Sequence, residues 1–232
     1  MPFVSSVNGL QEEIARRLNE SSISADHGDK YTTYINFAME DIATHFPKAP
    51  WLQSSAVLTL AAATRTWQTS SIGSDIRHVF DVRISAQNSK LQYFDPVAFD
   101  QLDPKPEDAG IPTLYTVFND EITFYPTPDA DYGAQVRYFK GVTQVSAASA
   151  VPELPRQFLQ GVILYGWALG LQEREDFDTS MIIEQKYQVW MDRVKKELKK
   201  ISKDSKRMLS IREIQTANRY YSNEVSQMFF GN

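Results

Sequence analysis

The stretch ITFYPTPDADYGAQVRYF, residues 122–139, decides the fold because it reads as two strands that a polar turn connects. Pro126 and Pro128 donate no backbone hydrogen bond and therefore end the first strand. The aspartates and the glycine that follow favour the backbone conformations that a reversal requires. Neither strand offers a nucleophile, a metal ligand or a phosphate-binding loop. The stretch predicts part of a β-sheet and no reaction.

Alternating polar and apolar residues predict further strands before this stretch. In residues 76–84, the side chains of Ile76, His78, Phe80, Val82 and Ile84 are expected on one face and those of Arg77, Asp81 and Arg83 on the other. Residues 57–62 alternate in the same way. We expect residues 114–118, 122–125 and 134–139 to form one antiparallel meander, after a short helix at the sequence DPVAFDQL.

Apolar residues at three- and four-residue steps predict four longer helices, two at each end of the chain. The first spans about residues 7–18, and the second starts at a capping Asp29 and ends before Pro47. The third follows Pro155, and its glycines Gly161, Gly166 and Gly170 permit close approach of a neighbouring helix. The fourth follows a cap at Asp178, Thr179 or Ser180 and has a narrow apolar seam, formed by Ile183, Tyr187, Trp190, Val194, Leu198 and Ile201.

Together these patterns predict an α+β fold. An antiparallel helical bundle, residues 1–50 and 151–204, carries a β-rich antiparallel domain, residues 51–150, inserted between the second and third helices. Residues 205–232 are expected to form an extended C-terminal arm.

Composition and motifs exclude several classes of function. The 232 residues include no cysteine, which excludes disulfides, thiolate metal sites and a cysteine nucleophile. We also expect no membrane span and no secretory signal. No nucleotide-binding or hydrolase motif occurs, and His27, His45 and His78 are too scattered to suggest a metal site. The sequence therefore predicts a protein that is not an enzyme and needs no cofactor.

Charge is distributed unevenly along the chain. Residues 1–185 carry 13 Lys+Arg against 24 Asp+Glu, a net of −11, whereas residues 186–219 carry 11 against 4, a net of +7. Such a basic segment indicates either the solvated face of a helix or contact with phosphate or an acidic partner. The residues that would make this contact are Lys195, Lys196, Lys199 and Lys200.

The last segment is too polar to form a core of its own, yet it contains apolar and aromatic side chains whose exposure costs about 1.5 to 3 kcal/mol each. Two interpretations remain open: the segment folds back on the bundle, or it binds a partner protein. The residues predicted to bind the partner are Leu209, Ile211, Ile214, Tyr220, Tyr221, Met228, Phe229 and Phe230, and Met208 belongs to the same group.

The order of elements resembles the head-to-tail adaptor proteins of tailed bacteriophages, also called connector, head-completion or tail accessory proteins. The similarity covers about residues 5 to 200. It rests on G-x-P-x-x-Y at Gly110, Pro112 and Tyr115, on the Y-P-x-P that ends the strand at Tyr125, and on a helix that begins after Pro155 and is followed by an acidic loop and a charged helix.

The resemblance implies a structural virion protein at the head–tail junction, made in the host cytoplasm during assembly. Such proteins form a homo-oligomeric ring, commonly twelve-fold, that docks on the portal protein and meets a downstream tail protein, namely a nozzle, tube or stopper. DNA passes through the ring without specific binding, and no membrane is involved. The C-terminal arm would reach the portal.

Three alternatives remain open from the sequence. The first is a tail-tube or tail-completion protein that does not contact the portal. The second is a hydrolase or nuclease that acts through acidic residues, and the third is a module that binds DNA without sequence specificity through the basic helix.

Overall fold

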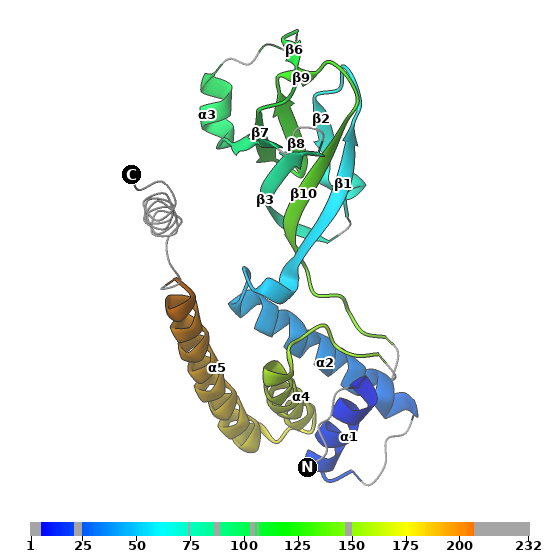
Figure 1. Cartoon of the computed structure of the whole chain (residues 1–232). Helices are drawn as coiled ribbons and strands as arrows, with labels where there is room; N and C mark the ends of the chain where they lie inside the picture. Colours follow the sequence, from blue (N-terminus) through cyan, green and yellow to red (C-terminus); the bar gives the residue numbers. More distant parts are fainter. Residues whose placement is uncertain are drawn as a thin grey trace, which may run out of the picture.

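The computed structural model describes residues 6–20, 25–73, 75–85, 89–102, 105, 107–146 and 150–206. It is a mixed α+β structure in which a helical part and a β-rich part stand end to end (Figure 1). The helices are α1 (Val7–Arg17), α2 (Ala25–His45), α3 (Pro96–Gln101), α4 (Leu159–Glu173) and α5 (Phe177–Lys206), with short 3-10 turns η1 (Pro50–Leu52), η2 (Thr69–Ser71) and η4 (Arg156–Phe158).

The strands all lie between α2 and α4. They are β1 (Gln53–Leu60), β2 (Thr66–Gln68), β3 (Ile76–Ile84), β4 (Ser89–Lys90), β5 (Gln92–Tyr93), β6 (Ala109–Gly110), β7 (Leu114–Phe118), β8 (Glu121–Tyr125), β9 (Thr127–Pro128) and β10 (Tyr132–Lys140).

Two predicted helix starts are wrong. α2 begins at Ala25, so Asp29 lies inside the helix. The side chain of Gln11 on α1 donates to the carbonyl of Gly28 and to Thr32 Oγ1, both at 2.7 Å, and these contacts hold the first turns of α2 against α1. α5 is capped by Asp176, whose carboxylate accepts from the backbone N–H of Thr179 at 3.2 Å.

α4 is the central helix because it contacts α1, α2 and α5. Its glycines make this possible, as the sequence predicted: a Cβ built at Gly161 would lie 2.2 Å from the ring of Trp190 on α5. The same atom at Gly166 and Gly170 would lie 2.7 Å and 2.5 Å from side chains of α1, namely Ile14 and Leu18. The four long helices therefore share one continuous apolar core.

The predicted meander is wrong in one respect. β7 and β8 form the expected hairpin, with Asn119 and Asp120 both at positive φ, but this hairpin belongs to a sheet of order β2-β8-β7-β5. β10 lies in the other sheet, of order β1-β10-β3-β4. The prolines after β8 end the ladder, and β9 pairs with β6 before the chain crosses to the second sheet. Two short pairs, β5–β7 and β6–β9, are parallel rather than antiparallel.

The predicted face of β3 is also interrupted. Its pairing with β10 shifts between Arg137 and Tyr138, so Phe80 is an extra residue and Val79 takes its place in the core between the sheets. Phe80 packs instead beside Phe139, with ring centroids 4.8 Å apart. A β-bulge inserts one residue and thereby exchanges the two faces of the strand beyond it.

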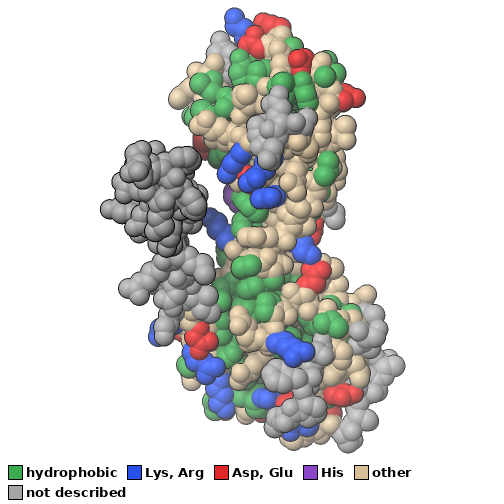
Figure 2. Space-filling view, in the orientation of Figure 1, with side chains coloured by type: hydrophobic (Ala, Val, Ile, Leu, Met, Phe, Trp, Pro, Cys, Tyr) green, Lys and Arg blue, Asp and Glu red, His purple; other side chains and the backbone are tan. Residues whose placement is uncertain are grey.

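A small aromatic cluster joins the two parts at a narrow waist, where Figure 2 shows hydrophobic side chains at the surface. Trp51, which follows α2, packs against Phe158 with ring centroids 4.5 Å apart. Asn36 of α2 exchanges two hydrogen bonds with the backbone of Val145, at 3.0 and 2.9 Å. The β-rich part is thus fixed to α2 and to the start of α4.

Candidate partner-binding surfaces

The apolar residues predicted to bind a partner lie outside the described residues. They are Met208, Leu209, Ile211, Ile214, Tyr220, Tyr221, Met228, Phe229 and Phe230. Their role stays a prediction.

The predicted basic contact residues lie near the end of α5. Lys196 and Lys199 are exposed, and Lys195 is half-buried. Lys200 belongs to the same helix, but its side chain is outside the description. Lys196 and Lys199 thus form a cationic surface of the helix, which is compatible with solvent or with an acidic partner.

The outer face of α5 exposes apolar residues that the sequence analysis did not single out. The side chains that are more than half exposed are Phe177, Met181, Ile182 and Val189. Phe37 on α2 is exposed to a similar degree. The sequence FDTSMII, residues 177–183, could have indicated this surface. Of its large apolar residues, only Ile183 belongs to the predicted buried seam, so the others were left without a buried position. Such side chains on a helical surface are typical of contacts between proteins.

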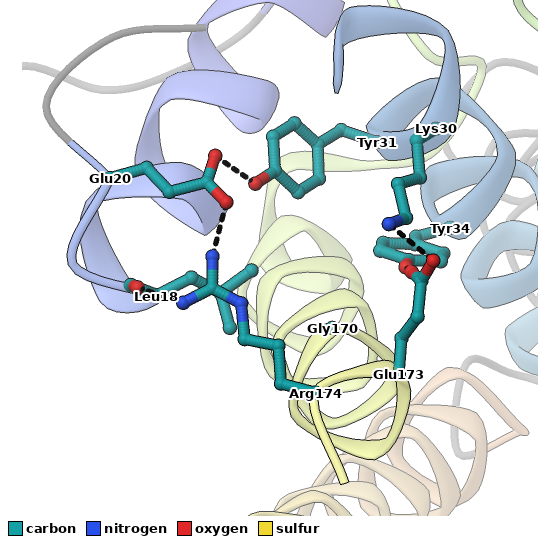
Figure 3. Close-up of a pocket in the computed structure, with 8 residues that line it drawn as sticks. All are labelled: Leu18, Glu20, Lys30, Tyr31, Tyr34, Gly170, Glu173 and Arg174. Atoms are coloured by element: carbon teal, nitrogen blue, oxygen red, sulfur yellow. Dashed lines mark hydrogen bonds and ion pairs between the residues drawn. The ribbon is translucent and has the colours of Figure 1, made fainter. Parts of the chain in front are cut away.

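A polar cluster ties the ends of α1, α2 and α4 together (Figure 3). Arg174, just after α4, pairs with Glu20 and donates to the carbonyl of Leu18 at 2.6 Å. Tyr31 donates to the same Glu20 carboxylate. On the other side of the cluster, Glu173 pairs with Lys30 and accepts a hydrogen bond from Tyr34.

The contacts of this cluster hold the helix ends together. Burial, followed by the hydrogen bond to Glu20, raises the pKa of Tyr31 above its usual range, so its hydroxyl stays a donor at neutral pH. The cavity beside it measures about 30 Å³, which is room for about one water molecule. The cluster joins three helix ends.

A second group of charges covers the outer face of the β1-β10-β3-β4 sheet. Asp81 is almost fully buried beneath three cations: Arg83 at 2.9 Å, Lys90 at 3.2 Å and Arg137 at 3.6 Å. Burial pushes the pKa of Asp81 up, but the bonds from Arg83 and Lys90 outweigh it, and the pKa lies below its usual value. Figure 2 shows Lys and Arg side chains grouped on the β-rich part just above the waist.

The two histidines whose side chains are described, His45 and His78, do not lie in a common site. His45 contacts its own helix through Asp41, and His78 stacks on Phe139 with ring centroids 6.4 Å apart. The side chain of His27 is outside the description. Across the described residues, no group of three or more His, Asp or Glu side chains could hold a metal ion. Within the same residues, no helix has the length and apolar character needed to cross a membrane.

Comparison with known proteins gives one family. The family model described as SU10 adaptor protein matches residues 5–219, which is most of the chain and includes every described element. No curated protein matches.

Proposed function

This chain belongs to the SU10 adaptor protein family, a family of bacteriophage structural adaptors, and from that membership we propose that it is a ring-forming adaptor of the head–tail junction. In this proposal several copies pack side by side beneath the portal, commonly twelve, and extend the DNA channel toward the next tail protein. The match over residues 5–219 carries the proposal. As a phage structural adaptor, the chain is a virion component whose partners are other phage structural proteins.

Two features of the structure support the finer part of the proposal. The exposed apolar residues of α5, such as Ile182 and Val189, give the helical part a surface that a neighbouring copy can cover. The polar cluster at the helix ends is satisfied by internal contacts, with Tyr31 and Arg174 both bound to the Glu20 carboxylate. A structural role accounts for both features.

We further propose that the segment from residue 208 to residue 232 docks on the portal. Its aromatic residues, such as Tyr220 and Phe229, would fill pockets of the portal surface. The acidic net charge of residues 1–185 suits a channel that passes DNA without binding it, because phosphate contacts would add a favourable binding term.

The test mixes the full chain with portal rings of the phage that encodes it and measures the mass of the complex by light scattering and electron microscopy. We expect a ring of this chain beneath the portal. A variant that lacks residues 208–232 should keep its helical circular dichroism and its thermal transition but no longer attach. A full chain that never joins the portal would contradict the proposal, and attachment by the shortened chain would contradict the role of the arm alone.

A further inference from the structure

Strand β1 is an open edge of its sheet. Among the described residues it pairs only with β10, over the full register from Gln53 to Leu60 (Figure 1). An edge strand presents a row of unpaired N–H and C=O groups, which proteins ordinarily protect with charged side chains, proline or bulges. The sequence of β1, QSSAVLTL, contains neither a charged residue nor a proline, and its register with β10 is regular.

The opposite edge of the same sheet is protected. β3 has two register irregularities against β10, and it carries Arg77 in its exposed half. β4, which covers the other half, consists of Ser89 and Lys90. The contrast shows that β1 lacks the protection that the remainder of the sheet has.

The direction of the free backbone groups follows from one hydrogen bond. The N–H of Leu91 donates to the carbonyl of Val82 at 2.9 Å, so Val82 directs its backbone groups away from β10. In an antiparallel sheet, two residues that are directly opposite either both direct their N–H and C=O groups toward each other or both direct them away. Val136, which is opposite Val82, therefore bonds to Ala56 on the β1 side. The alternate residues of β1 consequently direct their N–H and C=O groups to the open edge.

Among the described residues, those of β1 with both the N–H and the C=O unpaired are Ser55, Val57 and Thr59. Gln53 has the same direction, but its N–H already bonds to the carbonyl of Pro50. Val57 lies at the centre of these three residues, and its side chain is 70 % exposed. The free groups are therefore symmetric about Val57.

We propose that β1 pairs with β1 of a second copy of this chain, antiparallel, with the two-fold axis at Val57. In this register Val57 faces Val57 of the second copy, and Ser55 faces Thr59, so each of the three residues exchanges both backbone bonds. The residue on the axis faces its own copy, where a charged side chain would meet a like charge, and the uncharged Val57 avoids this repulsion. The cross-strand Val–Val pair adds an apolar contact, and the two sheets become one.

The contact goes beyond the adaptor role and does not depend on the portal. A two-fold contact of this kind uses the same surface on both chains and is complete with two copies. It therefore belongs to the free chain and differs from the contacts of a cyclic ring, which join two different surfaces. The pair covers the exposed edge until the chain meets its assembly partners.

Cysteine substitutions test the register, because the full chain contains no cysteine of its own. In the proposed pair, Val57→Cys places two thiols on residues about 5.5 Å apart at their Cα atoms, within the range of a disulfide. Ser55→Cys is the matched control, since it lies on the same strand but about 14 Å from its copy. We expect a cross-linked dimer from Val57→Cys, none from Ser55→Cys, and one from a mixture of the Ser55→Cys and Thr59→Cys chains.

Charge substitutions test the affinity by analytical ultracentrifugation of the free chain. Val57→Lys should raise the dissociation constant of the dimer by roughly tenfold, because it opposes two like charges. A mixture of Val57→Lys and Val57→Glu chains should restore the dimer. A wild-type chain that stays monomeric at all concentrations, or equal cross-linking of Val57→Cys and Ser55→Cys, would overturn the proposal. So would a Val57→Lys chain that pairs normally but loses portal attachment, since the edge would then serve another protein.

Discussion

Close packing at Gly161 can be tested by adding one methyl group. In Gly161→Ala, the new Cβ would lie 2.2 Å and 2.3 Å from two ring carbons of Trp190. Carbon atoms in ordinary contact are about 3.5 to 4.0 Å apart, so the Trp190 ring has to move by at least about 1 Å. Trp190 is buried, is stacked with Tyr187 at 5.8 Å and meets Phe158 edge-on at 6.3 Å. These neighbours restrict the movement of the ring.

The net effect is the difference between two terms. Overpacking of a core costs about 1 to 3 kcal/mol. Alanine in place of glycine in a helix interior stabilises the folded chain by about 1 kcal/mol, because alanine has the higher helix propensity. We expect Gly161→Ala to lower the free energy of unfolding by about 1 kcal/mol, which corresponds to a decrease in Tm of about 2 to 4 °C for a chain of this size.

Urea unfolding followed by circular dichroism measures this change, and two further variants isolate its cause. In Gly170→Ala, the new Cβ approaches Cδ1 of Leu18, the rotatable end of a flexible side chain, so we expect little or no loss. In a Trp190→Leu background the obstacle is removed, and Gly161→Ala should become stabilising. A Gly161→Ala chain that is more stable than wild type while Trp190 is present would refute the reasoning.

Two further substitutions address the charged groups. Arg174→Met removes the ion-pair partner of Glu20 and the donor to the Leu18 carbonyl, and should lower the free energy of unfolding by about 1 kcal/mol; an unchanged Tm in calorimetry would contradict the role of the cluster. Asp81→Asn should destabilise the chain at pH 7, because the carboxylate no longer compensates the three cations around it. Since the pKa of Asp81 is lowered in the folded chain, its contribution is complete above the usual carboxyl value of about 3.9 and is lost as the pH falls through the folded value. The difference in urea midpoint between wild type and variant should therefore shrink in acid, and a difference that is independent of pH would exclude this explanation.

The sequence predicts the helices well where the information is local. The apolar repeat placed α4, and its glycines predicted the close approach of a neighbouring helix but did not identify α1 as one of the helices contacted; the cap of the short helix α3 at Asp95 lies within the predicted segment. The start of α2 was missed because it depends on Gln11, which lies 17 residues before its partner Gly28. No local pattern reports such a contact.

The sheets were less predictable, since strand partners are chosen over long separations. β10 follows β8 closely in sequence, yet it pairs with β1, and residues 53 and 139 face each other. The bulge at Phe80 likewise depends on the partner strand. The predicted partner-binding residues beyond position 207 lie outside the described residues. The exposed apolar face of α5 and the open edge of β1 could be identified only from the structure, because they depend on which faces and strand edges other elements cover.

The register of β1 against β10 has a mechanical consequence for a protein of the virion. The helical part connects to the sheets through the first residue of β1 and the last residues of β10, and Gln53 and Phe139 are directly opposite each other. A force that pulls the two parts away from each other enters both strands at the same end and in the same direction. The two strands then move as one ribbon, and the tension passes to the ladder between β10 and β3. Because the bonds of that ladder run across the strands, they resist in shear and share the force rather than opening one at a time.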